Sequence, residues 1–269
     1  MLHQFRTMKH MLKIITLSLL CTVMLQVNAT IKEEVVTYKV SDKTMKGFMV
    51  YNDAAKKAVP AVLIVHEWWG LTEYPKMRAH MLAELGYVAF CVDMYGEGKI
   101  ADNIADAQKF SGEVYSNPAV LQERFMAAYL TLIKNPKVDK DKVAAIGYCF
   151  GGTVVLNAAT MGVPLIGVVS FHGGLAGIKA GSEPLKTKVL VCHGGADKFI
   201  SEEDITNFKK QMEIAKASYD FKVYEGGLHA FTNPKSTENG KKFGIPIAYN
   251  EAADKASWND MKAFFKKLF

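Results

Sequence analysis

The sequence predicts an α/β protein in which one doubly wound, mostly parallel sheet carries helices on both of its faces. Short apolar runs alternate with helical patterns from about residue 30 to the C-terminus, and short connectors join them. Repeated strand-helix-strand units of this kind favour a parallel sheet. No repeat, low-complexity tract or interdomain linker interrupts the alternation, so residues 30–269 are predicted to form a single domain.

The individual elements follow from their local patterns. Alternating polar and apolar residues predict an opening antiparallel pair, whereas continuous apolar runs predict strands that are covered on both faces. Asn117 and Pro118 interrupt a long helical pattern, and Ser201 with Asp204 is typical of a capped helix start. The predicted strands are 35–40, 46–51, 61–65, 87–92, 142–146, 165–171, 188–192 and 220–224, and the predicted helices are 74–85, 102–134, one from Ser201, and a last one with Trp258, Met261, Phe265 and Leu268 on one face.

The most informative segment is Gly-Tyr-Cys-Phe-Gly-Gly at residues 147–152, which joins an apolar strand to a helix of small residues. A Gly-x-Cys-x-Gly turn at such a junction is the thiol form of the nucleophile elbow of α/β-hydrolases, where glycines let strand and helix approach closely. Cys149 would then stand at a helix N-terminus, whose dipole favours a thiolate. The alternative is a buried structural cysteine beside glycines that allow helix packing.

A nucleophile of this type needs a base, and the base needs an acid that orients it. Asp197 ends the glycine-rich loop after strand 188–192, and His229 lies in the loop after strand 220–224. Cys149, Asp197 and His229 therefore occur in the chain order that α/β-hydrolases use. Each residue alone is a weak signal, because an aspartate in a glycine loop is usually a turn former. Their joint placement predicts a catalytic triad.

The loop at residues 66–70 follows strand 61–65 and is expected to complete an oxyanion hole. The predicted donors are the backbone N–H groups of Phe150 and Trp68. Trp68, Trp69 and Phe150 are candidate pocket walls for an unsaturated or aromatic acyl group, and equally candidate core residues.

Glu67 lies in the same loop, where a buried carboxylate beside a cysteine could take or hold its proton. The alternative is a glutamate that hydrogen-bonds only local backbone amides. His172, after strand 165–171, is expected to have a structural or supporting role, because the triad already has its histidine.

Residues 1–29 have the pattern of a secretory signal peptide. Three basic residues and no acidic one precede or flank an apolar run at 14–25, and Val-Asn-Ala at 27–29 offers small residues for cleavage. The run is too short to span a bilayer as a helix. The sequence therefore predicts an exported protein, periplasmic or secreted, without stable membrane association after cleavage. An uncleaved membrane-anchoring helix is the alternative.

Composition excludes several classes of protein. The chain carries a formal charge of +6, but no dense basic stripe with interleaved aromatics, so nucleic-acid binding has no support. Beyond the signal, Cys91 and Cys192 lie in apolar strand patterns and Cys149 in the turn, which is an odd count without paired spacing. No spacing suggests a metal site, so neither a metal nor another cofactor is expected.

Four segments together resemble the dienelactone hydrolase family (carboxymethylenebutenolidases). They are 65–71 (Val-His-Glu-Trp-Trp-Gly-Leu), 147–152, 193–197 (His-Gly-Gly-Ala-Asp) and 229–234 (His-Ala-Phe-Thr-Asn-Pro), and the likeness runs from about residue 38 to the C-terminus. The resemblance implies an α/β-hydrolase fold and metal-free hydrolysis of a lactone bearing a carboxylate. It implies Cys149 as nucleophile, His229 as base, Asp197 as its orienter and Glu67 as the group that controls protonation of the thiol.

One position departs from the family pattern. Arginines hold the substrate carboxylate in the best-studied branch, and one of them lies four residues after the catalytic histidine. Here that position is Asn233, which is expected to contact substrate, and no arginine occurs around Gln108, Lys109 and Phe110. An asparagine cannot supply the bidentate charged grip of a guanidinium. Acyl-transfer chemistry is therefore expected, but the sequence does not predict dienelactone itself as the substrate.

The sequence thus predicts an exported, cofactor-free hydrolase of a small ester or lactone, monomeric or a small homo-oligomer. A thioesterase is one alternative, and a non-catalytic ligand-binding protein on a hydrolase scaffold is another. A thiol redox protein is less well supported, because no resolving cysteine lies near Cys149.

Overall fold

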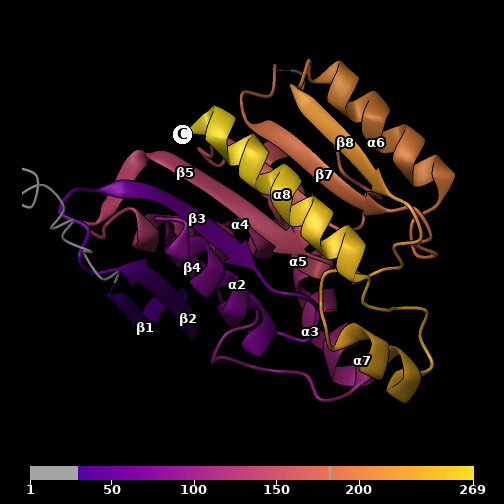
Figure 1. The fold of residues 1–269 in the computed structure, drawn as a ribbon, viewed down its shortest axis with the longest axis horizontal. Helices are drawn as coiled ribbons and strands as arrows, with labels where there is room; N and C mark the ends of the chain where they lie inside the picture. The colour runs from indigo at the N-terminus through magenta and orange to yellow at the C-terminus, as the bar shows by residue number, and fades with distance from the viewer. Residues whose placement is uncertain (1–29, 182) are drawn as a thin grey trace, which may run out of the picture.

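The computed structural model describes residues 30–181 and 183–269, which form an eight-stranded sheet with helices on both faces (Figure 1). The strand order is β1-β2-β4-β3-β5-β6-β7-β8. The predicted doubly wound, mostly parallel sheet and the single domain are therefore confirmed. The predicted signal peptide at residues 1–29 lies outside the described residues.

The strands differ in direction between the two ends of the sheet. β1, β2 and β4 pair antiparallel, as predicted for the opening pair, and every pair from β4 through β3 to β8 is parallel. Nearly all residues of the central strands are buried, which explains their continuous apolar runs. The bounds are β1 Ile31–Val40, β2 Lys43–Asn52, β3 Val59–Val65, β4 Val88–Val92, β5 Val138–Tyr148, β6 Gly167–Phe171, β7 Lys188–Gly194 and β8 Tyr219–Tyr224.

Two helical layers bury the two faces of the sheet (Figure 1). On one face, α2 (Glu73–Glu84) and α8 (Glu251–Leu268) contribute Leu82, Met261 and Phe265 to the core. On the other face lie α3 (Ile104–Tyr115), α4 (Pro118–Leu132), α5 (Phe150–Thr160) and α6 (Glu202–Ile214). The apolar stripe predicted for the last helix is the face that α8 packs against the sheet.

The helix boundaries largely match the sequence patterns. The predicted break near Asn117 separates α3 from α4, and the Asn117 side chain accepts hydrogen bonds from the first N–H groups of α4. Ser201 and Asp204 form the predicted capping box of α6. One helix, α7 (Ser236–Phe243), has no counterpart among the predicted elements. In the described residues, no helix is long and apolar enough to cross a membrane.

Candidate active site

Three parallel strands, β5, β7 and β8, end at the same edge of the sheet and position the predicted triad. β5 ends at Tyr148, directly before Cys149, and β7 and β8 end at Gly194 and Tyr224. The loops that follow β7 and β8 carry Asp197 and His229. Because neighbouring parallel strands present their carboxyl ends at the same edge, loops distant in sequence meet there.

The turn at Cys149 has the strained geometry of a nucleophile elbow. Cys149 adopts φ 52° and ψ −114°, a region that non-glycine residues rarely occupy. A Cβ at Gly147 would lie 2.0 Å from the Gly151 carbonyl oxygen, and a Cβ at Gly151 would lie 2.2 Å from the Val65 carbonyl oxygen. Both positions therefore require glycine. Strain of this kind costs about 1–3 kcal/mol and is found where the surrounding structure holds it.

His229 connects the cysteine to the aspartate. Its Nε2 lies 3.0 Å from Cys149 Sγ, and its Nδ1 lies 2.8 Å from Asp197 Oδ2. The other oxygen of Asp197 accepts a hydrogen bond from the Phe199 backbone N–H at 2.9 Å, so the carboxylate is held from both sides. The structure therefore brings the three predicted residues together in the predicted order.

The charges in this arrangement favour a protonated imidazole. Burial acts to lower the pKa of His229, but its electrostatic interaction with Cys149 and its hydrogen bonds to Asp197 and Cys149 outweigh burial and raise that pKa to about 10. An imidazolium beside a negatively charged sulfur is the activated form of a thiol nucleophile. The fully buried side chain of Asp197 stabilises the positive ring.

Glu67 is buried in the loop after β3, with only 3 % of its surface exposed. Its Oε2 accepts a 2.6 Å hydrogen bond from the Asn233 side chain. Burial raises the pKa of Glu67 to about 7, against the opposing effects of the Asn233 hydrogen bond and the positive charges of His229 and Arg78. Within the described residues, the Glu67 carboxyl group hydrogen-bonds neither to the Cys149 thiol nor to local backbone amides. Instead it shares a cavity with Cys149.

The two residues predicted to supply oxyanion donors line the same cavity as Cys149. Phe150 is the first residue of α5, so its N–H has no partner within the helix. The Trp68 carbonyl accepts a hydrogen bond from the Tyr95 hydroxyl at 2.9 Å, which fixes that loop. In the part of the chain that the structure describes, the N–H groups of Phe150 and Trp68 donate to no protein group and are available to a ligand.

The cavity at Cys149 has a volume of about 290 Å³ and walls that are mostly apolar. Trp68, Trp69 and Phe150 are among them, so all three predicted wall residues contribute, although Trp69 and Phe150 are also buried. None of the described residues that line it is a lysine or an arginine. The lining residues are Glu67, Trp68, Trp69, Tyr115, Cys149, Phe150, Gly174, Phe199, Ile200, His229, Ala230, Ile245 and Ile247.

Asn233 is placed differently from the expectation. It is 5 % exposed, it does not line the Cys149 cavity, and its amide donates to Glu67. It lines a neighbouring cavity of about 460 Å³ instead, which shares Trp69 with the first. Its side chain therefore sets the environment of Glu67 rather than reaching the space in front of Cys149.

Several wall residues carry no functional signal in the sequence. Tyr115 comes from the end of α3, Phe199 and Ile200 follow Asp197, and Ile245 and Ile247 follow α7. They are ordinary apolar or aromatic residues, and all except Tyr115 lie in loops. Ile245 and Ile247 reach the cavity because a β-bridge between His229 and Ile247 places their segment beside the loop that carries His229.

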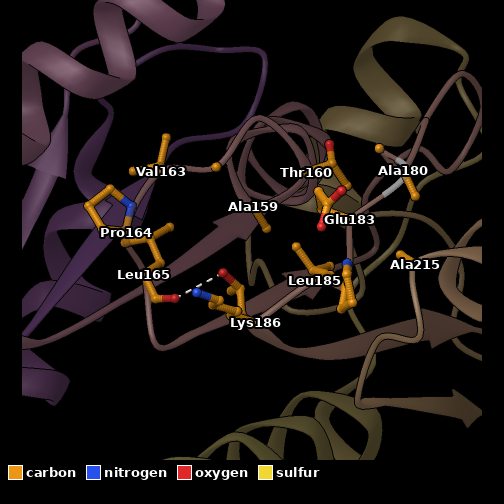
Figure 2. Close-up of a pocket in the computed structure, with 14 residues that line it drawn as sticks. Ala159, Thr160, Val163, Pro164, Leu165, Ala180, Glu183, Leu185, Lys186 and Ala215 are labelled. Carbon is orange, nitrogen blue, oxygen red and sulfur yellow. Dashed lines mark hydrogen bonds between the residues drawn. The ribbon is translucent and has the colours of Figure 1, made fainter.

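A third cavity, of about 350 Å³, lies at the opposite edge of the sheet (Figure 2). It is lined by the segments that precede β6 and β7, where Thr187 Oγ1 donates to the Leu165 carbonyl at 2.9 Å. None of the described residues that line it is a cysteine, a serine or a histidine, whereas Cys149 and His229 line the cavity of about 290 Å³. Among the described residues, no group of three or more His, Cys, Asp or Glu side chains could hold a metal.

Comparison with known proteins identifies the family of this chain. Residues 45–269 match the family model described as the dienelactone hydrolase family. The chain belongs to the dienelactone hydrolase family. Family members carry ester and lactone hydrolase names, and the chain is such a hydrolase.

Two curated relatives and one solved structure illustrate the likeness. Protein usf of Aquifex pyrophilus is 30% identical over 214 residues, which cover 77% of this chain and 88% of the relative. A protein of Aquifex aeolicus, provisionally named carboxymethylenebutenolidase, is 30% identical over 69% of this chain and 82% of its own length. The solved dienelactone hydrolase-like promiscuous phosphotriesterase from metagenomic libraries is 31% identical, with a TM-score of 0.82, and the match covers 89% of this chain and 99% of that one.

Proposed function

We propose that this protein hydrolyses a small, uncharged ester or lactone through an acyl-enzyme on Cys149. The observation that carries the proposal is the position of the His229 ring, 3.0 Å from Cys149 Sγ and 2.8 Å from Asp197 Oδ2, at the wall of a cavity of about 290 Å³. A nucleophile, a base and an orienting acid in hydrogen-bond reach are the requirements of this chemistry.

In the first half-reaction, the Cys149 thiolate attacks the carbonyl carbon and forms a C–S bond. The carbonyl electrons move to its oxygen, which accepts hydrogen bonds from the N–H groups of Phe150 and Trp68. Collapse of this intermediate breaks the C–O bond to the leaving group, and the His229 imidazolium gives that alkoxide its proton. A thioester on Cys149 and a neutral imidazole remain.

In the second half-reaction, neutral His229 takes a proton from water, and the resulting hydroxide adds to the thioester carbonyl. Collapse then breaks the C–S bond and releases the carboxylic acid and the Cys149 thiolate. Asp197 stabilises the imidazolium in both steps. Glu67, which faces the same cavity, is proposed as the group that controls the protonation state of the thiol before substrate binds.

The substrate class follows from the walls of the cavity. Apart from His229, which is committed to Cys149 and Asp197, they offer mainly aromatic and branched aliphatic side chains and no lysine or arginine, and Glu67 is the one carboxyl group among the described lining residues. A substrate carboxylate would lose its hydration without gaining a positive partner, which is costly. We therefore infer an uncharged acyl group, in contrast to the carboxylate-bearing lactone of the family name. A neutral phosphate triester is a second candidate, because a similar solved protein is a promiscuous phosphotriesterase.

Activity of the purified protein on a panel of uncharged esters, lactones, thioesters and phosphate triesters tests the proposal. We expect turnover of an ester or lactone by the wild type, and its loss in Cys149→Ala. Preference for thioesters would support the thioesterase alternative, and binding without turnover would support a non-catalytic protein.

We also propose that residues 1–29 direct export, as the basic start and apolar run suggest. N-terminal sequencing of the protein recovered from its native compartment should then begin at Thr30. A chain that still begins at Met1 would contradict this.

A further inference from the structure

His172 is a fully buried histidine directly behind the nucleophile. It follows β6, its exposed surface is 0 %, and it does not line the Cys149 cavity. Its Nδ1 accepts a 3.0 Å hydrogen bond from the backbone N–H of Cys149, which also donates to the Phe171 carbonyl at 3.0 Å. The ring therefore contacts the backbone of the nucleophile, while His229 contacts its sulfur.

These contacts determine which nitrogen of the ring carries the proton. An Nδ1 that accepts from an N–H cannot itself be protonated, so a neutral ring has its hydrogen on Nε2. That Nε2 lies 2.7 Å from Thr232 Oγ1, which therefore accepts from it. The Tyr74 hydroxyl donates to the same Oγ1 at 2.6 Å. Thr232 thus holds the required tautomer of His172.

A buried ion pair anchors this chain of hydrogen bonds. Arg78 donates to the Tyr74 hydroxyl at 3.3 Å and to the Thr232 carbonyl at 2.9 Å, and it pairs with Asp254 of α8. Helices α2 and α8 are therefore connected to the elbow through Tyr74, Thr232 and His172. Buried networks in which every member is paired rigidify the groups that they contact.

His172 stays neutral in this setting. Burial and the positive charge of the neighbouring His229 hold the pKa of His172 well below its usual range, with a smaller contribution in the same direction from Arg78. The rings of His172 and His229 lie edge to face with centroids 5.5 Å apart. Protonation of His229 during turnover therefore leaves the Nδ1 of His172 free to accept the Cys149 N–H.

The Cys149 backbone needs such support. At φ 52° it is strained, and it carries the sulfur that lies 3.0 Å from His229 Nε2. A displacement of about 1 Å at reacting atoms can reduce a rate about 10²-fold. We propose that His172 is a positioning residue, which holds the strained backbone of the nucleophile by accepting the Cys149 N–H, and that Thr232 fixes the tautomer that makes this possible.

The proposal rests on the proposed function and is tested with matched pairs of variants. His172→Phe keeps a ring but removes both nitrogens, whereas His172→Asn keeps an acceptor near Nδ1 and tolerates the positive φ of 42° at this position. Thr232→Val removes the hydroxyl at nearly constant shape, and Thr232→Ser retains it. For each variant, the measurements are kcat and KM for an ester that the wild type hydrolyses, the rate of Cys149 alkylation by iodoacetamide, and the melting temperature.

We expect His172→Phe to lower kcat and the alkylation rate at least 10-fold, with KM within about threefold of the wild type. His172→Asn and Thr232→Ser should recover most of the loss, and Thr232→Val should lie between. A folded His172→Phe with wild-type kcat and alkylation, or equal loss in the Asn and Phe variants, would overturn the proposal. If His172→Phe does not fold, the Thr232 pair decides: equal kcat in Val and Ser would overturn it. Failure of the proposed function is distinguishable, because the wild type itself would then lack turnover.

Discussion

Glu67 is a carboxylic acid held at 3 % exposure on the wall of a cavity that also contains a thiol and an imidazole. One amide, that of Asn233, is its hydrogen-bond partner, and burial outweighs this contact in raising its pKa to about 7. A carboxyl group with a pKa near neutral pH can both accept and release a proton during turnover. Such a group is typical of a functional residue and costs stability when ionised.

Glu67→Gln should therefore lower kcat/KM by about 10²-fold or more, in the range expected for loss of a general base. The substitution keeps size and hydrogen-bonding capacity, so the fold should be little affected. Steady-state kinetics against an uncharged ester is the measurement. Activity within about twofold of the wild type would show that Glu67 only braces its loop.

The same residue should make stability depend on pH. Between the ordinary pKa of 4.5 and the raised value of about 7, the folded protein keeps a proton on Glu67 that the unfolded chain has released. The contribution of this titration to the free energy of unfolding is thus fully present below about pH 4.5 and is lost as pH rises through about 7. It amounts to about 3 kcal/mol. Glu67→Gln lacks this titration. From pH 4.5 to 8, the unfolding free energy of the wild type should therefore fall relative to that of Glu67→Gln. A difference between the two proteins that does not change with pH would contradict this assignment.

At the scale of elements, the cavity is built by segments that the sheet topology brings together. The loop after β3 supplies Trp68, the start of α5 supplies Phe150, and the segment after α7 supplies Ile245 and Ile247. None of these segments places a cation at the cavity. Asn233, in the position where the family pattern has an arginine, is turned toward Glu67 instead.

This arrangement predicts a preference for uncharged acyl groups. For a matched pair of esters that differ only in a terminal carboxylate, kcat/KM should be at least 10-fold higher for the uncharged member, because the carboxylate is desolvated without a partner. Asn233→Arg serves as the comparison variant. It should reduce the ratio of kcat/KM for the uncharged ester to kcat/KM for the acidic ester, because it introduces a positive charge. Preference of the wild type for the acidic ester would mean that another cation, such as Lys109, reaches the substrate.

At the scale of the whole molecule, the sequence predicted the parts of the fold that depend on local pattern. Continuous apolar strands, the break at Asn117 and the capping box at Ser201 all have short-range causes, and all are found. The helix α7 was missed because its residues are mostly polar, it contains Gly240, and only Ser236 and Gly240 of it are buried. Tertiary packing rather than a periodic stripe holds it.

The candidate site also contains some residues that the sequence predicts and others that only the fold identifies. Cys149, Asp197 and His229 were predictable because the order of strand ends in this topology places them at one edge. The partner of Glu67 was not predictable, since the contact between Glu67 and Asn233 joins loops 166 residues apart in the chain. The wall residues Phe199 and Ile245 carry no chemical signature in sequence, so only the fold identifies them.

The most direct test of the central claim is mass spectrometry of the intact protein during turnover of a slow, uncharged ester, followed by peptide mapping. We expect one acyl group on Cys149, and none on Cys91 or Cys192, whose thiols are fully buried. Prior treatment with iodoacetamide should modify Cys149 first and abolish both the adduct and the activity. An acyl group on another residue, or full turnover by Cys149→Ala, would contradict it.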